Sequence, residues 1–232
     1  LSKMSLFLDK VFEQKFCKFD GMNLNLGKKN SLIIPFDPLK CRNSVLKEKK
    51  AFWGKLSQNE SNDIFPVKGD AFRQTWMVSR EKDLTQLNFN IYNHPDLYEQ
   101  NIHLELIDYL KGFIPLLENF DTIMLNSLQI TSYADFYSAI GIERRIALPC
   151  FSNGGFMEWV HIISPLAYEK YFTKEVLLGA PAYKTQELEN GIVMLMNYAN
   201  PFECETAETI ERIIALNKYF WEHNLLVPTK MD

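Results

Sequence analysis

Two pairs of glutamates flank a short apolar segment near the C-terminal end of the chain. Glu187 and Glu189 precede the segment Ile192–Asn197, and Glu203 and Glu205 follow it. Clustered carboxylates suit acid–base catalysis on a small substrate, or charge pairing with the basic surface of another protein. These four glutamates are our candidate binding residues, and charge pairing is the chemistry we predict for them.

The spacing of Glu187 and Glu189 has two structural interpretations. In an extended segment, residues two apart point to the same face, so the two carboxylates would act together. Both also lie within Gln186–Gly191, whose polar residues and final glycine are typical of a solvated turn before a strand. We favour the turn, which places both carboxylates at the surface.

Other residues whose side chains could catalyse a reaction or bind a metal lack the spacing of a known site. The four histidines show no HExxH or HxxxH pattern: His94, His103, His161 and His223. Cys150 and His161 form a conceivable nucleophile pair, but no local motif supports it. The chain also has no GxSxG elbow, P-loop or GxGxxG motif. We therefore predict no catalytic residue, no metal and no cofactor.

The net charge of −4 is distributed unevenly along the 232 residues. Residues 1–60 hold 12 Lys or Arg against 6 Asp or Glu, whereas the remaining residues hold 13 against 23. The negative net charge of the residues after position 60 would repel a phosphate backbone and attract a basic protein. The charge pattern therefore argues against nucleic-acid binding and favours a basic protein partner.

Cysteine usage and hydropathy indicate the compartment. Cys17, Cys41, Cys150 and Cys204 are widely spaced and none belongs to a CxxC pair, which is typical of reduced structural thiols. No apolar run approaches the ~20 residues that cross a bilayer. We therefore expect a cytoplasmic protein that does not bind a membrane.

The segment from Gly191 to Asn224 contains the clearest structural signals. Its apolar run predicts a buried central strand over Ile192–Asn197, after which Thr206 is placed to cap a helix. That helix repeats apolar residues at roughly helical spacing, and we expect all of them to face the core: Ile210, Ile213, Ile214, Phe220 and Trp221. Asn224 follows as a left-handed C-terminal cap.

Further segments alternate apolar and polar residues, which predicts strands. These are Phe72–Ser79, Leu84–Tyr92, Asn101–Leu106, Phe156–Ile163 and the brief Val176–Leu178. Helical patterns occupy Ser5–Phe19, Val45–Leu56 and Tyr109–Asn119. The predicted fold class is α+β, an antiparallel sheet with helices packed on it. Because we find no linker or internal repeat, we predict one domain over residues 1–232.

The order of these elements resembles a family of bacterial proteins, the polymorphic-toxin immunity proteins of immunity family 52. An aromatic-rich N-terminal helical region precedes strands at Trp76 and Phe89–Ile91, and further segments then carry the resemblance. These segments are Phe120–Asp121, the tryptophan strand at 155–160, Gly191–Asn197, Pro201–Phe202 and the terminal helix that ends at Leu225–Leu226.

The resemblance implies a non-enzymatic antitoxin. Proteins of this kind act in competition between bacteria, for example by type VI secretion. Such a protein binds a cognate basic toxin, for example a nuclease, and occludes its active or substrate-binding surface. Two other classes remain open from the residues alone. One is a small hydrolase or transferase whose acid–base groups come from distant positions, and the other is a structural adaptor. The oligomeric state is not indicated.

Overall fold

The computed structural model describes thirteen segments of the chain. The described residues are 3–14, 21–25, 32–47, 52–57, 72–79, 84–91, 103–116, 122–127, 145–147, 159–169, 171–203, 206–224 and 226–228. They divide into two compact units, Leu1–Phe120 (unit 1) and Asp121–Asp232 (unit 2), which we describe separately. The prediction of a single domain stays a prediction.

Unit 1 contains five antiparallel strands in the order β2-β1-β3-β4-β5. Their bounds are β1 Gly21–Asn25, β2 Leu32–Pro35, β3 Phe52–Ser57, β4 Phe72–Ser79 and β5 Leu84–Ile91. The register pairs Phe72 with Ile91 and Ser79 with Leu84. The two predicted strands Phe72–Ser79 and Leu84–Tyr92 are therefore confirmed as an antiparallel pair over the described residues, and Tyr92 lies outside them.

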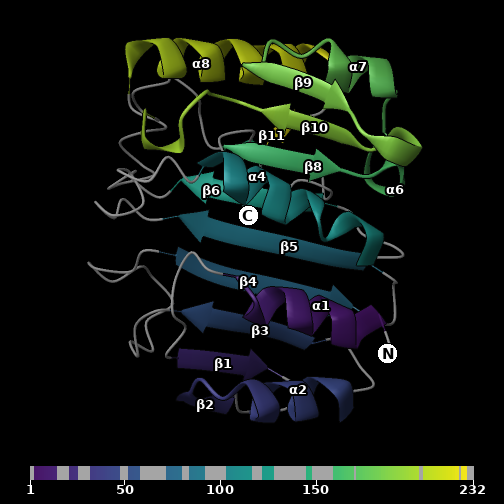
Figure 1. The fold of residues 1–232 in the computed structure, drawn as a ribbon. Coiled ribbons are helices and arrows are strands. Elements are labelled where there is room, and N and C mark those ends of the chain that lie inside the picture. The colour runs from purple at the N-terminus through teal and green to yellow at the C-terminus, as the bar shows by residue number, and fades with distance from the viewer. Residues whose placement is uncertain are drawn as a thin grey trace. The chain divides into compact units, whose positions relative to one another are not determined.

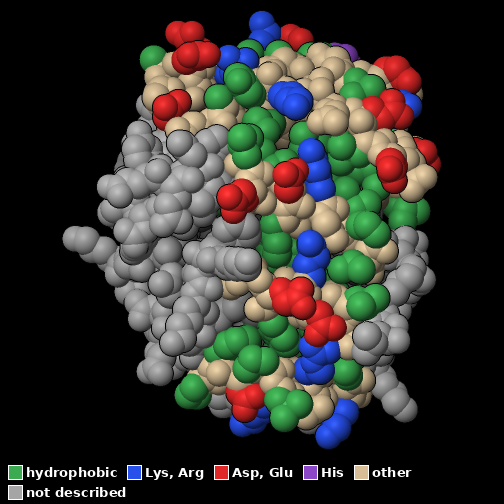
Figure 2. Space-filling model, viewed as in Figure 1, with side chains coloured by type: hydrophobic (Ala, Val, Ile, Leu, Met, Phe, Trp, Pro, Cys, Tyr) green, Lys and Arg blue, Asp and Glu red, His purple; other side chains and the backbone are tan. Residues whose placement is uncertain are grey.

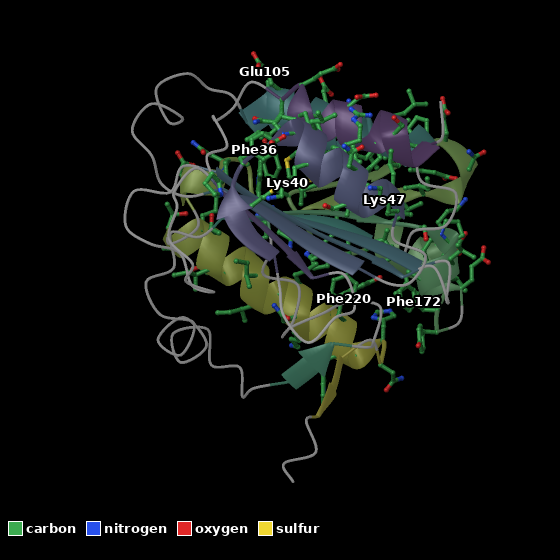
Figure 3. The ribbon with its side chains drawn as sticks, turned by 90° about the horizontal axis from the view of Figure 1, so that it is seen from below. Phe36, Lys40, Lys47, Glu105, Phe172 and Phe220 are labelled. Atoms are coloured by element: carbon green, nitrogen blue, oxygen red, sulfur yellow. The ribbon has the colours of Figure 1, made fainter. Side chains whose placement is uncertain are left out.

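Three α-helices of unit 1 lie on the same face of these strands, as Figures 1 and 3 show. They are α1 Lys3–Phe12, α2 Pro38–Lys47 and α4 His103–Lys111, the last followed by the 3-10 turn η1 Ile114–Leu116. Helix α1 confirms the beginning of the predicted helix Ser5–Phe19, although it ends at Phe12. The predicted helix Tyr109–Asn119 is wrong in its bounds, because α4 begins at His103 and ends at Lys111, directly before Gly112, and Ile114–Leu116 is a 3-10 turn.

Two further predictions in unit 1 are wrong. The expected helix Val45–Leu56 is instead the end of α2 followed by β3. Helix α2 begins earlier because an Asp37 carboxylate oxygen accepts the backbone N–H of Lys40 at 2.9 Å and Pro38 suits the first helical position.

The expected strand Asn101–Leu106 is the second error, since this region holds the beginning of α4. The buried residues of α4 are Leu106, Ile107 and Leu110, which follow a helical repeat, and Phe113 is buried directly after the helix. The alternation that suggested a strand covers too few residues to compete with this longer pattern.

Side chains from α1, α2 and α4 form the core of unit 1. Phe7 packs on Phe113 with ring centroids 5.4 Å apart, and both side chains are fully buried. At the border of this core, Lys10 lies over the rings of Tyr109 and Phe113 at 5.5 Å each, a favourable cation–π geometry. Arg42 of α2 pairs with Asp9 of α1 and donates to the Ser5 hydroxyl at 2.6 Å, which ties the two helices together.

Cys41 lies in this core, and burial raises the pKa of its thiol to about 12. Because the thiolate is the reactive form, we expect Cys41 to resist alkylation by iodoacetamide in the folded protein and to react once urea unfolds it. Peptide mapping by mass spectrometry measures this; rapid modification of Cys41 at pH 8 without urea would contradict it. Since the folded pKa is raised, the stability that the neutral thiol contributes is complete below pH 9. It falls as the pH rises through 12.

Unit 2 contains four antiparallel strands in the order β6-β8-β10-β9. Their bounds are β6 Thr122–Ser127, β8 Val160–Ile163, β9 Lys184–Glu187 and β10 Val193–Met196. A separate pair joins β7 Arg145–Ala147 to β11 Leu226–Pro228. Every residue of β10 is buried, which confirms the predicted buried strand within Ile192–Asn197. Strand β8 is the described end of the predicted Phe156–Ile163.

The helices of unit 2 are α6 Pro165–Tyr168, α7 Lys174–Leu178 and α8 Ala207–Glu222. Helix α7 corrects the predicted strand Val176–Leu178. Three apolar residues in a row cannot distinguish a strand from a helical turn, and Thr173 stands at the N-cap with extended backbone. Helix α8 begins as predicted, because the Thr206 hydroxyl accepts the Thr209 backbone N–H at 3.3 Å. Asn224 has the expected left-handed backbone, with φ of 60°.

These helices cover one face of β8 and β10. Leu177 of α7 and Leu216 and Phe220 of α8 pack with Val193 and Leu195 in one buried cluster. Phe172 is partly buried and packs against the same cluster. The fold is therefore α+β, with antiparallel strands and helices packed on them, as the sequence predicts.

One residue of α8 differs from expectation. We expected Trp221 to face the core, yet its exposed fraction is 38%, whereas its neighbour Phe220 is fully buried. Consecutive residues of an α-helix point about 100° apart, so one apolar stripe cannot include both side chains at its centre. Ile214 is likewise exposed, at 36%.

None of the described helices has both the length and the apolar character needed to cross a membrane.

Candidate protein-binding site

The hairpin that joins β9 to β10 carries the first pair of predicted carboxylates. Glu187 is the last residue of β9, and Glu189 begins the 3-10 turn η2 Glu189–Gly191. Asn190 and Gly191 have positive φ angles of 59° and 74°, which Asn and Gly adopt at low cost. Glu187 and Glu189 therefore lie at the same end of the β9–β10 hairpin, and both side chains are exposed.

Of the second pair of carboxylates, only Glu203 is among the described residues. Glu203 is exposed in the 3-10 turn η3 Pro201–Glu203, beyond the opposite end of β10, and Glu205 lies outside the described residues. The four residues of β10 alone span about 10 Å or more. Glu203 therefore lies at the opposite end of β10 from Glu187 and Glu189.

A shallow groove of about 430 Å³ opens beside the hairpin turn. Tyr168 and Phe172 form its aromatic side, with their rings 5.9 Å apart and nearly parallel. The Tyr168 hydroxyl donates to the Gly191 carbonyl at 2.8 Å, so the phenol is fixed against the turn. A Cβ at Gly191 would contact Tyr168 and Pro165 at 3.4 Å, which adds to the strain of its positive φ.

Four exposed carboxylates belong to the segments that form this groove, and we call them the acidic rim: Glu169, Glu175, Glu187 and Glu189. Glu169 lines the groove itself, and the other three are sequence neighbours or contacts of its lining residues: Glu175 follows Lys174, Glu187 contacts Lys174, and Glu189 precedes Asn190. Three of them, Glu169, Glu187 and Glu175, act electrostatically on Tyr168. Burial, and then the charge of Glu169, raises the pKa of Tyr168. Figure 2 shows Asp and Glu side chains gathered over α7 and the β9–β10 turn. The rim produces a negative potential around a partly apolar groove.

One cation sits within the rim. The Lys174 ammonium donates to Glu187 at 2.7 Å, and this hydrogen bond raises the pKa of Lys174. Lys174 also lines the groove, with a side-chain exposed fraction of 32%. Among the described residues it is the one cation that acts on Tyr168. The ammonium of Lys174 therefore neutralises part of the negative charge of the acidic rim.

The two units differ in net charge. Unit 1 holds 17 Lys or Arg against 15 Asp or Glu, a balance of +2, whereas unit 2 holds 8 against 14, a balance of −6. The acidic character noted from the sequence therefore belongs to the unit that carries the groove. Of the other candidates, His161 is buried in β8, His223 is exposed after α8, and Cys150 lies outside the described residues.

Sequence reasoning missed the aromatic groove and half of the rim. Lys174 and Glu187 are 13 residues apart, so only the folded hairpin brings them together. One available signal was Asn190-Gly191, a dipeptide typical of tight hairpins, which would have predicted β9 before the turn. In the part of the chain that the structure describes, no three His, Cys, Asp or Glu residues group so that they could hold a metal ion.

Comparison with protein-family models, with curated proteins and with solved structures finds no match to the chain. The resemblance to the immunity family stays a prediction.

Proposed function

We propose that this chain is an immunity protein that binds a basic toxin in the cytoplasm and covers the toxin's active or substrate-binding surface. The observation that carries the proposal is the acidic rim, four exposed carboxylates on the segments that form a groove with aromatic walls. The charge balance of −6 in the same unit supports it. The resemblance in the order of elements points to the same class of protein.

The electrostatics favour this kind of partner. A nuclease presents Lys and Arg to the phosphate backbone, and an acidic protein surface competes for the same residues. Opposite charges on the two surfaces accelerate association, while buried aromatic contacts slow dissociation. A groove with aromatic residues inside and carboxylates outside offers both kinds of contact.

The enzyme alternative has less support from these residues. Acid–base catalysis by carboxylates favours a desolvated cleft, because burial brings their pKa toward neutrality. All four rim carboxylates are exposed, and the pKa of Glu175 is lowered by its own backbone N–H and by the Thr173 side chain. An ionised, exposed carboxylate suits charge pairing better than proton transfer at neutral pH.

A charge-reversal comparison tests the binding mode. We expect replacement of the rim residues Glu169, Glu175, Glu187 and Glu189 by lysine to slow association with the basic toxin about tenfold and to weaken its salt dependence. The matched control replaces four exposed glutamates elsewhere: Glu13, Glu105, Glu211 and Glu222. Stopped-flow or surface-based kinetics at several salt concentrations measure both variants. Equal rates for the two variants would mean that net charge, and not this surface, sets association.

A further inference from the structure

We propose that the outer edge of β9 binds an extended basic segment of the toxin, which adds to unit 2 as a further antiparallel strand with a lysine or arginine opposite Glu187. This inference rests on the proposed function and specifies how the toxin is held. Backbone groups of β9 supply the hydrogen bonds, and nearby carboxylates select the charge of the segment.

Strand β9 is an exposed edge. It ends the order β6-β8-β10-β9 and, among the described strands, pairs only with β10 (Figure 1). Every residue of β8 and β10 is buried, whereas none of the four residues of β9 is buried. An exposed edge presents a row of backbone donors and acceptors with which another extended chain can pair.

The register decides which backbone groups of β9 point outward. In an antiparallel pair, hydrogen-bonded pairs of residues alternate with pairs whose N–H and C=O groups point away from each other. Leu188 and Ile192 continue the β9–β10 register, and the Leu188 N–H donates to the Ile192 carbonyl at 2.7 Å. Because orientation alternates along the strand, Glu187 and Thr185 direct their N–H and C=O groups to the outer edge.

A second hydrogen bond leads to the same assignment. The Asn197 N–H donates to the Trp159 carbonyl at 2.8 Å, and these two residues continue the register of β10 with β8. Leu195 has the orientation of Asn197 and therefore bonds to β8, while its neighbour in β9 is Thr185. The pair of Leu195 and Thr185 is therefore not hydrogen-bonded, which again leaves Thr185 directed outward.

The charges at this edge decide the chemistry of the added strand. A residue directly opposite Glu187 would lie on the same face as its carboxylate, where opposite charges stabilise a strand pair. The Lys174 ammonium already donates to Glu187 at 2.7 Å on that face, which shows that a cation is stable there. Glu189 and the balance of −6 in unit 2 add to the attraction for a basic segment.

A second copy of this chain fits the edge less well. When two copies pair antiparallel, outward residues stand opposite outward residues, so Glu187 of one copy would face Thr185 or Glu187 of the other. Lys184 has its backbone turned toward β10 and cannot stand opposite Glu187. Two copies therefore gain no charge pairing in this strand, and a basic segment of another protein is the occupant that the charges favour.

A peptide tests the edge without the toxin. The probe is acetyl-Gly-Lys-Thr-Val-Thr-Gly-amide, whose lysine and valine stand opposite Glu187 and Thr185 in antiparallel pairing. The control has the same side chains, with the lysine and valine backbone nitrogens methylated to remove both donors. At twice its dissociation constant, which we expect to be on the order of millimolar, the probe should slow hydrogen exchange of both amides about threefold. The methylated control should leave exchange unchanged.

Variants then separate the backbone donor from the side chains. Thr185→Pro removes the outward N–H, a change that an edge strand tolerates. Thr185→Val keeps that N–H and removes only the hydroxyl, which donates to the Leu178 carbonyl at 3.0 Å. We expect the proline variant to bind the probe about threefold more weakly and the valine variant to bind it like the wild type. Thermal melts show whether both are folded, and the methylated peptide decides the question if the proline variant is not.

The charge preference has its own comparison. Exchange of the probe's lysine for glutamate should weaken binding about threefold, and Glu187→Gln should abolish the difference between the two peptides. Glu211→Gln, an exposed carboxylate on α8, is the matched control and should preserve that difference. Equal binding of both peptides to the wild type would overturn the preference for a basic segment.

The possible outcomes separate this inference from the proposed function. Equal effects of the probe and its methylated control, effects only outside β9, or no effect would each overturn the edge site. Dimerisation of the chain through β9 would also overturn it. Loss of the edge site with intact charge-dependent protection from the toxin would leave the immunity function standing. Probe binding at the edge without any protection from the toxin would instead defeat the immunity function alone.

Discussion

Replacement of Phe220 by alanine is expected to lower the free energy of unfolding by about 3–5 kcal/mol, the usual cost of emptying a large core site. Phe220 is fully buried and packs in the cluster that joins α7 and α8 to β10. Its ring meets that of Tyr219 edge-on, with centroids 5.5 Å apart. Deletion of the ring leaves a cavity between helix and strands that the surrounding side chains fill only in part.

Trp221→Ala is the matched control for this experiment. The two residues are neighbours in α8 and both are large aromatics, but Trp221 is 38% exposed. We expect its loss to cost less than about 1 kcal/mol. Urea unfolding of both variants, followed by circular dichroism, measures the difference. Similar losses for the two variants would show that the orientation of α8 differs from the one described.

Replacement of Trp159 is expected to cause the second large loss in the free energy of unfolding. Its side chain is fully buried, and the indole N–H donates to the Tyr198 carbonyl at 2.7 Å. The Asn197 backbone N–H in turn donates to the Trp159 carbonyl at 2.8 Å, so this residue secures the ends of β8 and β10 to each other. We expect Trp159→Ala to cost about 3–5 kcal/mol in the free energy of unfolding.

Trp159→Phe separates packing from hydrogen bonding. Phenylalanine keeps most of the aromatic volume and removes the indole donor, so we expect an intermediate cost of about 1–3 kcal/mol. Chemical denaturation gives both values. If the phenylalanine variant were as stable as the wild type, the hydrogen bond to Tyr198 would contribute nothing, and packing alone would explain the role of Trp159.

The strands were predictable where local pattern and burial agree. Leu87, Phe89 and Ile91 alternate with polar residues, and all three lie in β5. β10 was predictable because an unbroken apolar run fits a strand buried on both faces. The Thr206 cap was predictable because a hydroxyl before a helix satisfies a backbone N–H of the first turn.

Helical orientation and the site depended on contacts that the sequence does not show. Phe220 and Trp221 have similar hydrophobicity, and only the packing of α8 on β10 decides which is buried. Glu187 was identifiable as a candidate from its type and position. Its partner Lys174 and the Tyr168–Phe172 wall approach it only through the fold. Tertiary placement therefore determines the groove, whereas local pattern determines the strands.

Protection of cells from the cognate toxin tests the proposed function most directly. Cells that express the toxin are supplied with the wild type, with the fourfold lysine variant at the rim residues Glu169, Glu175, Glu187 and Glu189, or with the control variant at Glu13, Glu105, Glu211 and Glu222. Matched expression and circular dichroism establish that all three proteins are folded. We expect the wild type and the control variant to restore growth and the first variant to restore it poorly. Full protection by a folded first variant would contradict the acidic-surface mechanism, and failure of the wild type to protect would contradict the immunity function itself.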